Sequence, residues 1–82
     1  MELRKKVLVD KIEVNQVGCV HIRISTSIYD GDQLVANSFH RHVVAPGDDY
    51  SAEDARVQAI CAATHTDDVV AAFRAAAAAS GV

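Results

Sequence analysis

The residue pattern of the chain changes at Pro46-Gly47, and this change limits the folds that are open to it. Before Pro46, β-branched residues alternate with polar ones, which is typical of strands that bury one face. After Gly47, alanine predominates and β-branched residues thin out, as is typical of helices. Strands followed by helices within one short chain predict an α+β fold.

We expect three strands, at about residues 5–14, 19–29 and 34–44, that form an antiparallel meander. Two helices, at about 52–64 and 67–79, are expected to pack on one face of this sheet. Ser51 opens a variant of the capping box, and Thr66 is the expected N-cap of the second helix. At 82 residues, the chain is expected to be one domain, residues 1–82.

The hairpin between the second and third strands predicts how these strands pair. A two-residue loop after Asp30 places Ile24 opposite Phe39 and Val20 opposite Val43, so that apolar pairs share the face beneath the helices.

The same register predicts a polar outer face. His21 falls opposite His42 and Arg23 opposite His40 on this face, whereas Arg41 turns toward the core.

The first strand contains a conflict that predicts an irregularity. A three-residue loop before the second strand places Ile12 opposite Val20, but it also turns Asp10 onto the core face. We therefore expect a bulge or an edge position near Lys11, where Val7 and Val9 change faces.

The residues of the outer face leave three interpretations open. Three histidines on one sheet face could bind zinc or iron, could be exposed without a ligand, or could contact a protein. Neighbouring arginines and the lack of a carboxylate partner disfavour a metal, so we expect no metal and no other cofactor. The residues that we expect to contact a protein are Arg23, Tyr29, His40, Arg41 and His42.

Other residue patterns disfavour catalysis. Cys61 and His65 lie four residues apart, a spacing that would allow a thiolate–imidazole pair on one face of a helix. However, Cys61 lies on the apolar stripe of the expected helix, and this position favours a buried structural cysteine. We find no hydrolase, phosphate-loop or dinucleotide-binding motif, and expect no catalytic residues and no small-molecule substrate. Cys19 and Cys61 are expected to be free thiols in a reducing compartment.

The net charge and the first residues of the chain limit the kinds of partner that we expect for this protein. A net charge of −3 disfavours non-specific nucleic-acid binding, which requires a basic surface. No segment is long and apolar enough to span a membrane, and the first residues do not fit a signal peptide. We therefore expect a protein that is made in the cytoplasm and binds neither nucleic acid nor membranes.

The strand–turn–helix segment has the pattern R-H-V-x-x-P-G-D-D at residues 41–49, followed by two expected helices with a V-x-A-I sequence and an H-T junction. In this pattern it resembles small proteins encoded in the tail regions of tailed bacteriophages or prophages, which have an H-T or W-T junction between the helices. The likeness runs over about residues 9–79. The segments that carry it are residues 11–14, 28–31, 39–51, 55–61, 65–66 and 69–73.

The resemblance implies a non-enzymatic, virion-associated structural or accessory protein of the tail, baseplate or tail fibre. Such a protein would bind a larger tail or baseplate protein, copies of itself, or both. It implies no catalytic or ligand residues. The alternative is a small soluble phage effector that inhibits a host defence or regulatory protein, for which the acidic charge would suit a nucleic-acid-binding target.

Overall fold

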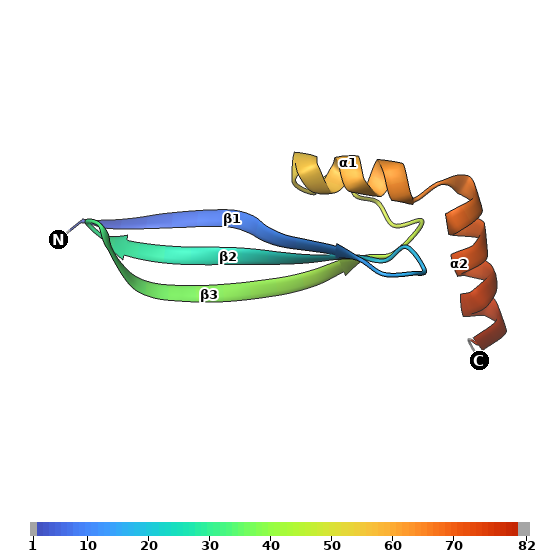
Figure 1. The fold of residues 1–82 in the computed structure, drawn as a ribbon, viewed down its shortest axis with the longest axis horizontal. Coiled ribbons are helices and arrows are strands. Elements are labelled where there is room, and N and C mark those ends of the chain that lie inside the picture. Colours follow the sequence, from blue (N-terminus) through green and yellow to red (C-terminus); the bar gives the residue numbers. More distant parts are fainter. Residues whose placement is uncertain (1, 81–82) are drawn as a thin grey trace.

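The computed structural model describes residues 2–80 and confirms the α+β fold (Figure 1). Three antiparallel strands form one sheet in the order β1-β2-β3, and two helices follow the sheet. The elements are β1 (Leu3–Val14), β2 (Val20–Asp30), β3 (Gln33–Val44), α1 (Ala55–Thr64) and α2 (Asp67–Ser80).

The molecule is elongated, with extents of 55 × 26 × 18 Å. Most of this length is the sheet, because a strand of twelve residues spans roughly 40 Å. In Figure 1, α1 lies near the C-terminal end of β1, and α2 lies beyond the ends of the strands. Neither α1 nor α2 lies beside the other end of the sheet, near the N-terminus.

The core lies where α1 meets the sheet. Val20, Ile22 and Val44 from the sheet are buried against Val57 and Cys61 from α1. The expected packing of a helix on one sheet face therefore holds for α1.

The second helix packs differently from our expectation, because it lies against the turns at the ends of the strands. A Cβ atom added to Gly18 would lie only 2.8 Å from Cγ1 of Val69. This close approach requires a glycine in the first turn, and its φ of 94° requires one as well.

The junction between sheet and helices has the expected turn but a different helix start. Gly47 has a φ of 94°, and the hydrogen bond from Asp48 N to Ala45 O closes the turn at 3.0 Å. The expected cap at Ser51 is wrong, since α1 begins later, with Asp54 as the N-cap that accepts from a backbone amide in the first turn.

The expected N-cap of α2 is confirmed. The hydroxyl of Thr66 accepts a hydrogen bond from Val69 N at 3.3 Å. Asp67 and Asp68 occupy the first turn, where their carboxylates interact favourably with the helix dipole.

The register between β2 and β3 begins as predicted and then shifts by one residue. Asp30 pairs with Gln33 across the two-residue loop, but the register changes between Ile28 and Tyr29 because Val35 forms a bulge. From there to its end, β3 is displaced by one position relative to the prediction. Since side chains alternate along a strand, this displacement exchanges the two faces of β3.

Several predicted positions on β3 are therefore wrong. Phe39 and Val43, expected in the core, are 48% and 49% exposed on the face away from α1. Arg41, expected on the core face, lies beside them. His40 and His42, expected on the outer face, lie on the face that α1 covers.

We name the two faces by their relation to α1. The α1 face carries Leu3, Lys5, Val7, Val9, Ile12, Val14, Val20, Ile22, Ile24, Thr26, Ile28, Asp30, Gln33, Ala36, Ser38, His40, His42 and Val44. The open face carries Arg4, Lys6, Leu8, Asp10, Lys11, Glu13, His21, Arg23, Ser25, Ser27, Tyr29, Leu34, Asn37, Phe39, Arg41 and Val43.

The expected irregularity in β1 is confirmed, because the register shifts between Val9 and Lys11 and places Val7 and Val9 on the core side of the sheet. The predicted pairing of Ile12 with Val20 is wrong, because Ile12 pairs with Ile22. The connecting loop is longer than expected, since the side chain of Asn15 accepts hydrogen bonds from two amides within it.

Candidate functional site

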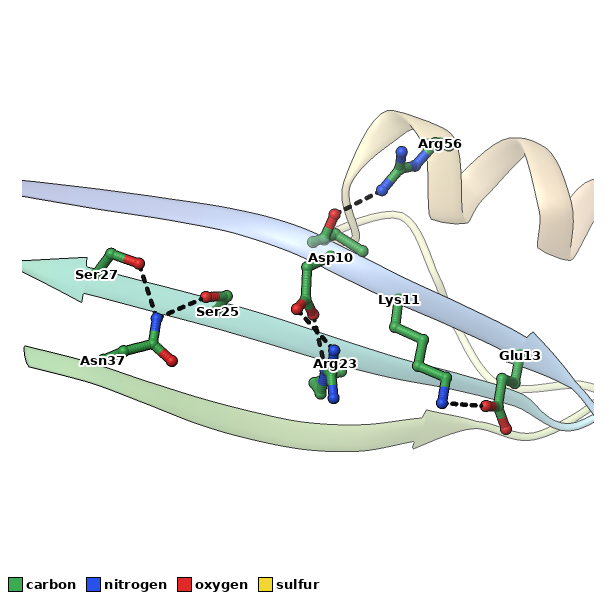
Figure 2. Close-up of polar contacts among 9 residues, drawn as sticks. Asp10, Lys11, Glu13, Arg23, Ser25, Ser27, Asn37 and Arg56 are labelled. Carbon is green, nitrogen blue, oxygen red and sulfur yellow. Dashed lines mark hydrogen bonds and ion pairs between the residues drawn. The ribbon is translucent and has the colours of Figure 1, made fainter. Parts of the chain in front are cut away.

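The centre of the open face is an ion pair between β2 and the bulge of β1 (Figure 2). Arg23 donates from Nε and Nη2 to the two carboxylate oxygens of Asp10, each at 2.9 Å. The hydrogen bonds from this guanidinium lower the pKa of Asp10, and the carboxylate raises the pKa of Arg23. The two-pronged geometry fixes the plane of the guanidinium on the open face.

An aromatic ring of β3 completes this arrangement. The guanidinium carbon of Arg23 lies 4.6 Å from the centroid of the Phe39 ring, and that of Arg41 lies 5.8 Å from it. Two cations near one exposed ring are cation–π contacts. Arginine and aromatic side chains of this kind are enriched where proteins bind one another.

A shallow hollow of about 270 Å³ lies next to this arrangement. At its rim, Lys11 Nζ pairs with Glu13 at 2.7 Å, which lowers the pKa of the Glu13 carboxyl. The residues that line the hollow are Lys11, Glu13, His21, Ile22, Arg23, Arg41, His42 and Val43. Its lining combines cations with apolar surface, so that it could accept a carboxylate or an acidic loop of a partner.

Toward the N-terminal end of the sheet, the open face is held by polar contacts between strands. Asn37 donates to the hydroxyls of Ser25 at 3.1 Å and Ser27 at 2.8 Å, and both serines are buried (Figure 2). Further along, the guanidinium of Arg4 lies 5.7 Å from the centroid of the Tyr29 ring. These contacts order side chains on a surface that neither α1 nor α2 covers.

The net charge of the open face is opposite to that of the whole chain. Five cationic side chains and the two carboxylates of Asp10 and Glu13 give it a balance of +3, whereas the chain has −3. The cations are Arg4, Lys6, Lys11, Arg23 and Arg41. The open face therefore favours an acidic partner surface.

The structure divides the predicted contact residues between the two faces. Arg23, Tyr29 and Arg41 share the open face, but His40 and His42 lie on the α1 face. There, His42 Nε2 lies 2.9 Å from a carboxylate oxygen of Glu53, between β3 and the segment before α1.

The possible site of three histidines on one face is therefore wrong, because the Val35 bulge separates His21 from His40 and His42. Among residues 2–80, no group of three or more His, Cys, Asp or Glu side chains could hold a metal ion.

Sequence reasoning missed Phe39 and Asp10 as members of the site. Asp10 could have been found, because its conflict with the core face predicts the bulge that turns its carboxylate toward Arg23. For Phe39, the available signal was Arg41, which lies two residues away on the same face of β3 and which the predicted register turned into the core. A buried arginine without a partner is costly, so that register required a shift.

Cys61 and His65 have structural roles in α1 and at its end. The Cys61 thiol is buried in the core, and this burial raises its pKa, which keeps it protonated. The His65 ring donates from Nε2 to the carbonyl of Gly18 at 2.7 Å, which joins the end of α1 to the first turn of the sheet.

Comparison with protein-family models, curated proteins and solved structures gives no match for this chain. In the part of the chain that the structure describes, neither helix is long and apolar enough to cross a membrane.

Proposed function

We propose that this protein is a non-enzymatic structural or accessory protein of a tailed-phage virion that binds a larger tail, baseplate or tail-fibre protein through its open face. The observation that carries the proposal is an ordered but uncovered surface. Phe39 is half exposed beside two guanidinium groups, and neither α1 nor α2 covers this face of the sheet. The phage context comes from the resemblance of residues 39–51.

The chemistry of this surface indicates the kind of partner. A buried aromatic anchor that is surrounded by charged groups is a common centre of a protein–protein interface. The balance of +3 favours a partner patch that is acidic at its rim and apolar at its centre. Arg23 is already held by Asp10, so that binding would restrict less side-chain motion than with a free arginine.

The test is incorporation into particles. Mass spectrometry of purified virions should detect the wild-type protein, and absence from the particle would contradict the structural role. Arg41→Glu, on the open face, should reduce incorporation about tenfold or more, because it places a like charge against an acidic partner. His40→Glu is the matched control: the neighbouring residue on the same strand, exposed on the other face.

Both substitutions lie on β3, and any effect on the edge of that strand is common to the two variants. A loss of incorporation in Arg41→Glu alone therefore identifies the open face. Equal losses in both variants would contradict its role in binding.

The alternative function is a soluble effector that inhibits a host nucleic-acid-binding protein. The observation that favours it is the excess of acidic residues over residues 48–68, where six carboxylates accompany one arginine. Protein that is found in infected cells but not in purified virions would favour this role.

A further inference from the structure

The chain exposes more surface than a compact protein of its size. Its accessible surface is 5732 Å², whereas a compact monomer of 8.8 kDa exposes about 4,800 Å². Its radius of gyration is 16.7 Å, compared with about 12 Å for a compact domain of this length. The excess of roughly 900 Å² is close to the area that each partner buries in an interface of standard size, about 800 Å².

The outer edge of β1 is protected against pairing with another strand. Six of its twelve residues are charged, and the bulge near Asp10 interrupts its regular edge. The guanidinium of Arg56 from α1 also donates to the carbonyl of Val9 at 2.6 Å (Figure 2). Charges, a bulge and a covering group are the devices by which proteins prevent the addition of strands.

The outer edge of β3 lacks most of these devices. Arg41 is its one charged residue, and the strand contains no lysine, proline or glycine. Beyond the bulge at Val35, the residues from Ala36 to Val44 pair regularly with β2. In Figure 1, β3 forms the edge away from α1, and α2 lies beyond its end. This edge can therefore accept another strand.

We infer that β3 pairs in an antiparallel manner with β3 of a second copy of this chain, about a two-fold axis. The dimer would contain a sheet of six strands in the order β1-β2-β3-β3-β2-β1, with backbone hydrogen bonds across the axis. The two open faces would join into one surface. Because the β1 edges are protected, the assembly ends at two copies.

The charge on β3 favours a second copy in the antiparallel direction. Arg41 lies toward one end of the strand, so pairing centred on Ser38 or Phe39 separates the two Arg41 residues by roughly 13–20 Å along the strands. Parallel pairing would place them side by side. The edge has no negative charge, and its nearly neutral side chains suit an identical strand.

Sedimentation equilibrium of the full chain tests this inference with a matched pair of substitutions. Ser38 on β3 and Val7 on β1 are both opposite Thr26, in one row of the α1 face, and both are exposed. The wild type should sediment with twice the mass of 8.8 kDa. Ser38→Lys should raise the dissociation constant about tenfold or more, because the two lysines meet near the axis.

Val7→Lys should leave the dissociation constant within about twofold of the wild type, since it adds charge to an edge outside the interface. Circular dichroism should show the same fold for all three proteins. Hydrogen exchange should show protection of alternate amides along β3 that is lost in Ser38→Lys. A monomeric wild type, equal effects of the two substitutions, or rapid exchange along the outer edge of β3 in the dimer would each overturn the inference.

The dimer goes beyond the proposed function and does not depend on it. Sedimentation measures pairing of the β3 edge, whereas incorporation into virions measures binding by the open face. Failure of one test therefore leaves the other result standing.

Discussion

The exchange of faces on β3 predicts that two neighbouring valines contribute very differently to stability. Val44 is 3% exposed in the core, and Val43 is 49% exposed on the open face. Val44→Ala removes two buried methyl groups, which corresponds to about 1.6 kcal/mol at ~0.8 kcal/mol each. A remaining cavity of roughly 25–50 Å³ adds ~0.6–1.2 kcal/mol. The expected loss in the free energy of unfolding is therefore about 2–3 kcal/mol.

Val43→Ala removes the same atoms from a position that is half in water and leaves no enclosed cavity. Its expected cost is about 0.8 kcal/mol, half of the transfer free energy for Val44. Any difference in strand propensity between valine and alanine applies to both variants and does not alter their order. In a domain of this size, the melting temperature should fall by about 8–24 °C for Val44→Ala and about 3–6 °C for Val43→Ala.

Thermal unfolding followed by circular dichroism measures both values. All samples should be at the same low protein concentration, because association adds a contribution that depends on concentration. If Val43→Ala destabilised the protein more than Val44→Ala, the register without the Val35 bulge would be the right one, and the assignment of Phe39 and Arg41 to the open face would be refuted.

Three further predictions concern other parts of the fold. Gly18→Ala should destabilise the protein by about 1–3 kcal/mol in chemical denaturation, because its φ is positive and the new methyl group meets Val69; a neutral effect would contradict this packing of α2. An NMR titration should give Asp10 a pKa below the ordinary 3.8, so that its pairing with Arg23 stabilises the protein above that pH and is lost as the pH falls below it; a pKa above 3.8 would contradict the ion pair. In the native protein, a thiol reagent should react with Cys61 only after unfolding, because burial raises the pKa of this thiol; rapid reaction would place it outside the core.

The sequence predicted the order and type of all five elements. Alternation of β-branched and polar residues is a local property of each strand, and the Pro46-Gly47 turn depends on two residues. The bulge in β1 was also predictable, because Asp10 would otherwise face the core. These features depend on neighbours along the chain and on the cost of burying a charge.

Which side chains lie on the open face depends on packing between elements that are distant in the chain. One extra residue at Val35 exchanges the faces of β3, and the adjacent residues Val43 and Val44 are both valines, so that local preference does not indicate which of them faces the core. The shifted register is favoured only when the core is assembled, because Val44 then packs against Val57 and Cys61, and His42 contacts Glu53. Local residue patterns define the five elements and their order. Packing against α1 determined which side chains face a partner, because a strand has the same local energy with either face inward.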